Sequence, residues 1–250
     1  MNVERNALRV YQTLLDDGLA VVPTSAGYGL LAMGRRGVER IYALKGRPSS
    51  KPCITVTTWP IFDDVAQPID APTRRWIDQT IRWTPLAVVA PIRPQSRLLA
   101  EADPFVVAQC TQAGTVATFH RAGALVTRVA ALALADGRLV VGSSGNRSGT
   151  GNAYTLDEVP ARAQADLVVD VGPIPIPGGA RLATTILDLG TGLFLREGLH
   201  FDRIARSWER HQRQRDPGAP APAPHVATRA RGAAAPLAQP AASPFRPDTR

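Results

Sequence analysis

Short apolar or β-branched segments alternate with amphipathic helical segments along most of this chain, and this alternation constrains the fold more than any other feature. Segments such as 54–57, 86–90 and 139–142 are continuous runs, typical of strands that are covered on both faces. No repeat of 20–50 residues recurs. The order of elements therefore predicts an α/β domain, a twisted mixed sheet with helices on both faces.

The individual elements follow from periodicity, proline and glycine. Thr155 with Glu158 three residues later is typical of a capping box at a helix start. Residues 24–29 carry two glycines and are expected to form a loop. Helices are predicted over 3–15, 37–44, 60–66, 73–81, 104–112, 122–135, 155–163 and 202–214, and strands over 19–22, 54–57, 86–90, 115–118, 139–142, 167–170, 184–188 and 193–196.

The C-terminal part has a different composition. From Pro217 onward, 8 of 34 residues are proline and 11 are alanine, so little apolar surface is available to bury. Residues 1–208 are therefore predicted to be the folded domain, and residues 209–250 a disordered tail. Half of the net charge of +8 lies in that tail, which has seven arginines against three acids. This charge permits RNA binding without demonstrating it.

The chain is expected to be a cytoplasmic protein without a membrane partner. No apolar stretch approaches the roughly 20 residues that a bilayer requires, and the polar N-terminus is unlike a secretory signal. Cys53 and Cys110 fit no disulfide or metal spacing and are predicted to be buried, reduced thiols. The four histidines also lack ligand spacing, so no metal site formed by the protein is predicted. The oligomeric state stays open.

Three segments carry residues suited to phosphates, and each also has a simpler interpretation. Residues 23–30, Pro-Thr-Ser-Ala-Gly-Tyr-Gly-Leu, could line a pocket or form an ordinary tight turn. Residues 45–52, Lys-Gly-Arg-Pro-Ser-Ser-Lys-Pro, could bind anions or form a solvated basic turn at a helix end. Residues 142–149, Gly-Ser-Ser-Gly-Asn-Arg-Ser-Gly, follow an apolar strand and could bind a ligand or be a polar loop.

Taken together, these segments resemble the YrdC/YciO family of threonylcarbamoyl-AMP synthases. The resemblance rests on Lys-x-Arg-Pro-x-x-Lys-Pro at 45–52, Ser-x-Asn-x-Ser-Gly at 144–149 and Leu-Arg-Glu-Gly at 195–198. Pro-Thr-x-x-x-Tyr-Gly at 23–29, Arg-Trp at 82–83 and Thr-Thr-Ile-Leu-Asp at 184–188 agree in position. It covers about residues 6–200 in the right order.

The resemblance implies a fold with a basic concave cavity and a nucleotidyltransferase activity. Members of the family condense ATP, threonine and bicarbonate into threonylcarbamoyl-AMP and pyrophosphate, with Mg²⁺, for the t6A37 modification of tRNA. Double-stranded RNA binding is also ascribed to the family. By position, the expected catalytic residues are Lys45 and Arg47, the expected nucleotide-binding residues are Ser144, Asn146, Thr184 and Arg196, and Thr24 and Tyr28 are expected to line the amino-acid end.

Such chemistry needs two anions held in line and positive charge around the phosphates, without a protein nucleophile. The chain accordingly shows no Ser-His-Asp or Cys-His arrangement.

Several positions depart from the family pattern, and all lie on the amino-acid side. An acid and a threonine of the family become Ser25 and Ala26, a further threonine is lost around Ala87, and an arginine becomes Phe119 unless Arg121 replaces it. Three functions therefore stay open: the synthase itself, adenylation of a different carbamoyl or carboxyl substrate, and a non-catalytic nucleotide- or RNA-binding paralogue.

Overall fold

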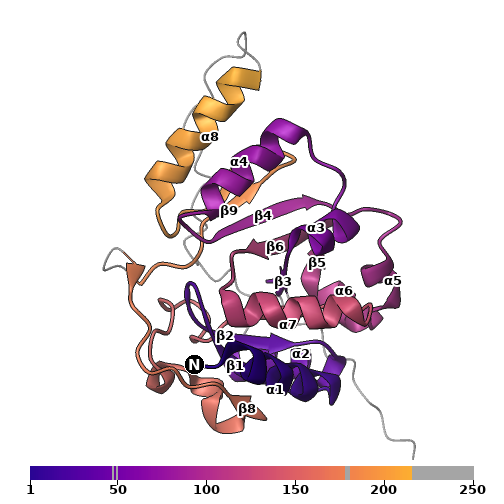
Figure 1. Ribbon diagram of the computed structural model, residues 1–250, viewed down its shortest axis with the longest axis vertical. Helices are drawn as coiled ribbons and strands as arrows, with labels where there is room; N and C mark the ends of the chain where they lie inside the picture. The colour runs from indigo at the N-terminus through magenta and orange to yellow at the C-terminus, as the bar shows by residue number, and fades with distance from the viewer. Residues whose placement is uncertain (47, 49, 178–180, 216–250) are drawn as a thin grey trace, which may run out of the picture.

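Every described strand of the protein belongs to one mixed β-sheet. The computed structural model describes residues 1–46, 48, 50–177 and 181–215, and Figure 1 shows the arrangement of their elements. Within these residues ten strands pair in the order β10-β9-β4-β6-β3-β7-β2-β1-β8, with β5 beside β6. The strands are β1 Ala20–Thr24, β2 Gly27–Ala32, β3 Ile54–Val56, β4 Leu86–Pro91, β5 Thr111–Gln112, β6 Thr115–His120, β7 Val141–Ser144, β8 Leu167–Val168, β9 Ile186–Asp188 and β10 Phe194–Arg196.

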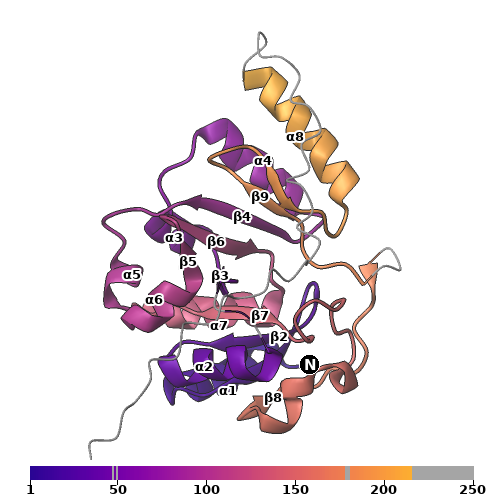
Figure 2. The same ribbon diagram turned by 180° about the vertical axis from the view of Figure 1, so that it is seen from behind.

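Helices flank this sheet, which confirms the predicted fold class. Helix α7 packs on β1 and β3, and helix α2 packs on β2 and β7. Helix α7 faces the viewer in Figure 1, whereas α2 comes forward in the reverse view of Figure 2, so they cover opposite faces. The helices are α1 Val3–Leu15, α2 Arg35–Lys45, α3 Trp59–Val65, α4 Ala71–Ile81, α5 Arg97–Glu101, α6 Pro104–Cys110, α7 Ala124–Ala135 and α8 Phe201–Arg215.

Local chemistry explains where several helices begin. The side chains of Asn2, Asp70 and Ser96 each accept a hydrogen bond from a backbone N–H of the first turn. Proline in the first turn of α3, α4 and α6 costs no hydrogen bond, because those N–H groups have no partner within the helix. Helix α2 ends at Gly46, which adopts the left-handed conformation with φ 54°.

The predicted loop at residues 24–29 is wrong. Only the turn at its centre is irregular, and Gly27 already begins β2, which pairs antiparallel with β1 and with β7. The two glycines suggest a turn because they carry no strand preference, but Gly27 is needed for its φ of 96° and for its close approach to the carbonyl of Ala153. The sequence therefore did not predict β2, a fully buried strand.

Two further expectations need correction. The helix predicted over 155–163 is a pair of 3₁₀ turns, η1 Leu156–Glu158 and η2 Pro160–Gln164, because Pro160 cannot donate the hydrogen bond that an α-helix requires. The predicted capping box between Thr155 and Glu158 is present. The strand predicted over 139–142 is β7, shifted to Val141–Ser144, so Ser143 and Ser144 lie within the sheet rather than after it.

Helix α8 continues to Arg215, across the domain boundary predicted at residues 208 and 209, and packs on α4 at one end of the molecule (Figures 1 and 2). The predicted tail lies largely outside the described residues and stays a prediction. Within the described part of the chain, no helix is both long and apolar enough to cross a membrane.

Candidate functional site

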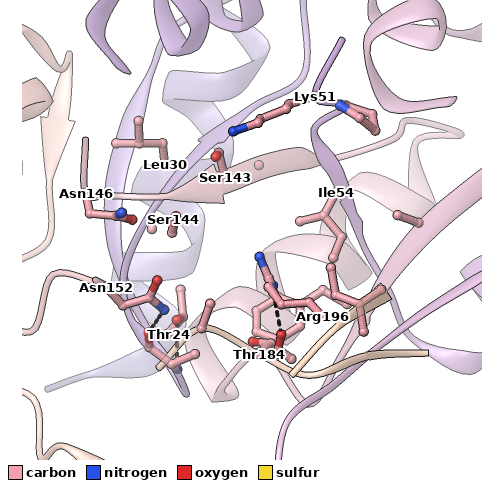
Figure 3. A pocket seen from close by; sticks show the side chains of 18 of the residues that line it. Thr24, Leu30, Lys51, Ile54, Ser143, Ser144, Asn146, Asn152, Thr184 and Arg196 are labelled. Carbon is pink, nitrogen blue, oxygen red and sulfur yellow. Dashed lines mark hydrogen bonds between the residues drawn. The ribbon is translucent and has the colours of Figure 1, made fainter. Parts of the chain in front are cut away.

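A cavity of about 680 Å³ opens where the central strands meet the turn before β2, the segment before β3 and the loop after β7. Its lining comes from segments far apart in the sequence, as Figure 3 shows for Thr24, Lys51, Ser144 and Arg196. The described lining residues include Lys45, Lys51 and Arg196 but no aspartate or glutamate. An anionic ligand would therefore meet no carboxylate on the described walls.

The predicted site residues that the structure describes all line this cavity. They are Thr24, Tyr28, Lys45, Ser144, Asn146, Thr184 and Arg196. Arg47, the other predicted catalytic residue, lies outside the described residues. The expected meeting of these segments around one cavity is thus confirmed, whereas the role of each side chain stays a prediction.

Lys45, the last residue of α2, is buried rather than solvated, with 5% of its surface exposed. Its ammonium group donates to the backbone carbonyl of Ser144 and to that of Asn146, the latter at 2.5 Å. The alternative of a solvated basic turn is therefore wrong for Lys45. Lys45, at the C-terminal end of α2, therefore holds the loop after β7 in place.

Asn146 is 6% exposed and organises the loop after β7. Its side-chain N–H groups donate to the carbonyl of Arg147 at 2.8 Å and to that of Thr150 at 2.7 Å. Its side-chain oxygen Oδ1 is buried and has no hydrogen-bond partner among the described residues. A buried acceptor left without a donor is costly, so this oxygen is suited to accept a hydrogen bond from a ligand or a bound water.

Thr184, in the segment just before β9, and Arg196, on β10, approach the cavity at one edge of the sheet. The Nε of Arg196 donates to the carbonyl of Thr184 at 2.8 Å, shown as a dashed line in Figure 3. This bond holds the exposed arginine across the cavity mouth. Its position agrees with the predicted role of an arginine that closes over a bound nucleotide, which stays a prediction.

The hairpin between β1 and β2 forms another part of the cavity wall. Thr24 Oγ1 donates to the carbonyl of Gly27 at 2.6 Å and accepts from the N–H of Ala26 at 3.0 Å, so its hydroxyl stabilises the turn. The hydroxyl of Tyr28 donates to the carbonyl of Gly172 at 2.8 Å and accepts from the N–H of Val171 at 3.1 Å. Burial raises the pKa of Tyr28 above its ordinary value. Both hydroxyls therefore already have partners within the protein.

Phe119, one of the positions that depart from the family pattern, lies in an apolar region of the cavity. Phe119 lies on β6 with Ala117 and contributes to the lining, as do Val56 on β3 and Val89 on β4. Ala87, opposite Phe119 in the sheet, is fully buried. This part of the cavity offers surface for apolar contact and little for hydrogen bonding.

Arg121 does not take the place of the missing arginine. Its guanidinium donates to the carbonyl of Ile81 at 2.8 Å, and the residue is not among those that line the cavity. Ser25 also turns away from a ligand, because its hydroxyl donates to the carbonyl of Arg121. The alternative of a shifted arginine at this position is therefore wrong.

Two lining residues were missed by the sequence analysis. Asn152 is buried and donates from its side chain to the carbonyl of Ala26 at 2.7 Å, which joins the loop after β7 to the hairpin turn. Lys51 extends from the segment before β3 toward Ser143 in Figure 3. Lys51 belonged to the basic motif but was given no role, and no local pattern around Asn152 marks it as a brace.

The cysteines agree with the prediction of buried, free thiols. Cys110, at the end of α6, contributes to the cavity wall. Burial, with Cys53 nearby, raises the pKa of the Cys110 thiol to about 12. The thiol is therefore protonated at neutral pH and is a poor nucleophile.

The family model for the Sua5, YciO and YrdC proteins, described as telomere recombination, matches residues 12–198. The chain belongs to this family. The resemblance found from the motifs is thereby confirmed over nearly the same range. Among curated proteins, no significant sequence match is found.

Three solved structures share the fold. Sua5 of P. abyssi, crystallised with L-threonine, has a TM-score of 0.65 and 20% identity, and the match covers 83% of this chain and 58% of that one. A hypothetical protein of Streptococcus mutans UA159 has a TM-score of 0.66 and 18% identity, with 80% and 90% covered. E. coli YciO has a TM-score of 0.56 and 18% identity, with 78% and 90% covered. The chain thus spans little more than half the length of P. abyssi Sua5.

Proposed function

We propose that this protein is a nucleotidyltransferase of the L-threonylcarbamoyladenylate synthase type. In this reaction the amine of threonine and bicarbonate give a carbamate and water, and a carbamate oxygen attacks the α-phosphorus of ATP. The new O–P bond forms as the bond from the α-phosphorus to the bridging oxygen breaks, which releases pyrophosphate. The product supplies the threonylcarbamoyl group of t6A37 in tRNA.

One observation carries this proposal. Residues from four separate segments, around Thr24, Lys45, Asn146 and Arg196, meet at a single cavity without a described carboxylate in its lining. Family membership supports the same reaction class, and the Sua5 structure with L-threonine supports threonine as the amino acid.

Some of the described residues would contact the ligand, and others hold those residues in place. Lys51 and Arg196 supply positive charge at the cavity walls, where charge develops on the transferred phosphate. Asn146 Oδ1 accepts a hydrogen bond from the ligand or its water shell. Lys45 fixes the loop that carries Ser144 and Asn146, so its main contribution is to position them.

Mg²⁺ is expected to bind together with ATP, and the residues that line the cavity indicate whether the protein would supply its ligands. No described lining residue carries a carboxylate, and no cluster of three metal-ligating side chains exists among the described residues. Mg²⁺ keeps several waters and binds readily through substrate phosphates. It would therefore arrive with ATP, where it offsets phosphate charge, with Asn146 accepting a hydrogen bond from one of its waters.

The test is pyrophosphate release by the purified chain in ATP, Mg²⁺, threonine and bicarbonate. The proposal expects release that requires both threonine and bicarbonate, and an Asn146→Asp variant that loses most of it, because a carboxylate at this buried position repels phosphate. Asn2→Asp, which makes the same substitution at the exposed cap of α1 outside the cavity lining, serves as the matched control. Release that is independent of threonine would overturn the proposal.

A different acyl substrate is the second candidate, and the apolar region around Phe119 favours it. Neither Phe119 nor Arg121 offers the cavity a cation for an amino-acid carboxylate. A screen of amino acids and carbamoyl phosphate for AMP- or pyrophosphate-forming turnover separates this candidate from the first. Binding of ATP without any turnover across the screen would instead favour a non-catalytic paralogue.

A further inference from the structure

The apolar region of the cavity is continuous across four neighbouring strands of the sheet, β9, β4, β6 and β3. Phe119 on β6 lies opposite Val56 on β3, and Ala117 on β6 lies opposite Val89 on β4, so these side chains share one face of the sheet. Phe119 and Val89 are each only 9% exposed. The apolar region consists of Ile54, Val56, Val89, Ala117, Phe119 and Ile186.

These four strands offer a ligand almost no polar group. Among their described lining residues, only Thr115 has a polar side chain, and its hydroxyl donates to the carbonyl of Gln112 at 2.7 Å. None of those lining residues is charged. A hydroxyl or carboxylate placed against the apolar region would therefore lose its hydrogen bonds to water and gain few in return.

The polar groups of the cavity lie on other elements. Asn146, with its buried Oδ1, belongs to the loop after β7, and Arg196 lies at the end of β10. In Figure 3, Ile54 of the apolar region lies on the side of the cavity away from Asn146. The cavity thus has a polar side and an apolar side, and it suits a small ligand that is divided in the same way.

The hydroxyls expected at the amino-acid end do not favour a polar side chain either. Thr24 donates its hydroxyl proton to the carbonyl of Gly27, and Tyr28 donates its own to that of Gly172. Neither hydroxyl therefore has a proton to donate to the side chain of threonine. A methyl group in place of that threonine hydroxyl needs no partner and buries apolar surface instead.

We propose that the amino acid activated by this protein has a branched apolar side chain, of the valine type, which packs on the apolar region. Valine has the shape of threonine, with a methyl group where threonine has its hydroxyl. Its charged end would face the polar side of the cavity. The inference rests on the proposed function, since it names the amino acid of the same reaction, and the bonds formed and broken are those given above for threonine.

The test measures the binding of valine, threonine and alanine to the full chain by isothermal titration calorimetry. The solution contains bicarbonate, Mg²⁺ and α,β-methylene-ATP, an analogue that cannot release pyrophosphate, so that binding is measured without turnover. We expect valine to bind at least about tenfold more tightly than threonine, whose hydroxyl has no partner, and than alanine, which lacks two methyl groups.

A variant of the apolar region tests where the side chain packs. Val89→Thr adds a hydroxyl to the cavity wall without changing its shape, and the preference for valine over threonine should fall by about tenfold. Val168→Thr is the matched control, because it makes the same substitution on β8, at the other edge of the sheet and outside the cavity lining. This control should keep the preference. The order of affinities in the unmodified chain decides the proposal even if Val89→Thr does not fold.

Four results would overturn the inference: threonine binding at least as tightly as valine, no binding of either, equal losses of preference in the two variants, or a Val89→Thr variant that weakens only the ATP analogue. The last result would place the adenine ring, rather than the amino acid, on the apolar region.

Pyrophosphate release with ATP itself separates this inference from the proposed function. Valine that binds more tightly than threonine, with no release for any amino acid, would refute the reaction and leave the binding preference standing. Release that is faster with threonine than with valine at equal, subsaturating concentrations would support the reaction and refute the inference.

Discussion

The two halves of the cavity are built on different chemistry. The half formed by Lys45, Asn146 and the loop after β7 is polar and closely hydrogen-bonded. The half formed by β4 and β6 is apolar, with Val89 and Phe119 in its wall. The polar half can distinguish ligands by charge and by hydrogen bonds, whereas the apolar half can distinguish them mainly by shape. A change of substrate within this fold would therefore begin in the apolar half.

The largest expected effect tests whether the polar half depends on its buried lysine. Lys45→Ala should abolish turnover and lower the free energy of unfolding by about 3 kcal/mol, because two buried carbonyls lose a charged donor. Pyrophosphate release and urea denaturation measure the two losses. The exposed Lys51 gives the matched control: Lys51→Ala should weaken ATP binding and leave stability unchanged. Unaltered stability of Lys45→Ala would contradict the positioning role.

The next prediction concerns acid sensitivity behind the apolar half. His120 follows Phe119 on β6 and points to the other face of the sheet, where its ring lies 5.3 Å from Trp59 and 5.4 Å from Phe62, centroid to centroid. Burial, aided by the charge of Arg74, lowers the pKa of His120 to about 3. The imidazole is therefore neutral in the fold down to low pH.

In the unfolded chain the same imidazole takes up a proton below about pH 6.5, so stability is lost as the pH falls from about 6.5 toward 3. From pH 7 to pH 4.5 this loss amounts to about 2.5 kcal/mol. Denaturant unfolding of His120→Phe across this range should show a shallower decline than the unmodified chain. Burial also lowers the pKa of His211, which adds a decline of the same sign. Parallel curves for the two proteins would refute the assignment to His120.

A smaller effect tests how the apolar half selects its ligand. Phe119→Arg places a cation on the cavity wall without altering the polar half. If the amino-acid carboxylate binds there, the concentration of threonine needed for half-maximal pyrophosphate release should fall by about tenfold, which corresponds to about 1.4 kcal/mol. Phe119→Leu, which keeps the wall apolar, is the control. A rise in that concentration would place the carboxylate elsewhere.

The smallest expected effect separates structural from ligand-binding hydroxyls. Tyr28→Phe should lower the free energy of unfolding by about 1 kcal/mol, since its hydroxyl bonds Gly172 and Val171. Turnover should change by less than about twofold. Thermal unfolding and a turnover assay on the same preparation decide this, and a large loss of turnover would restore Tyr28 as a ligand-binding residue.

The sequence predicted the layers of the fold because those depend on periodicity, which is local. It missed β2 because Gly27 and Gly29 carry turn propensity, while the strand is stabilised by pairing with β1 and with β7, more than 100 residues away. The helix expected over 155–163 is replaced by two 3₁₀ turns, because Pro160 lacks the N–H that an α-helix needs at this position. Sequence periodicity thus predicted the elements that do not depend on pairing with residues far away in the chain.

For the site, motifs predicted which segments meet but not what each side chain does. For Lys45 the motif left anion binding and a solvated turn open, because its environment is set by carbonyls about a hundred residues away. Asn152 has no local signature because its partner is the carbonyl of Ala26. Arg121 could replace an arginine in the alignment of motifs, but its backbone, with φ 57°, directs it to Ile81.

The hydrogen bond from Asn152 to Ala26 has a consequence for how two substrates would bind. Together with the bonds of Asn146 to Thr150 and of Lys45 to Asn146, it links the end of α2 through the β7 loop to the hairpin turn. A ligand that fixes the loop also fixes the turn. The second ligand therefore loses less conformational entropy when it binds. The two substrates should bind with positive cooperativity even though they need not touch one another.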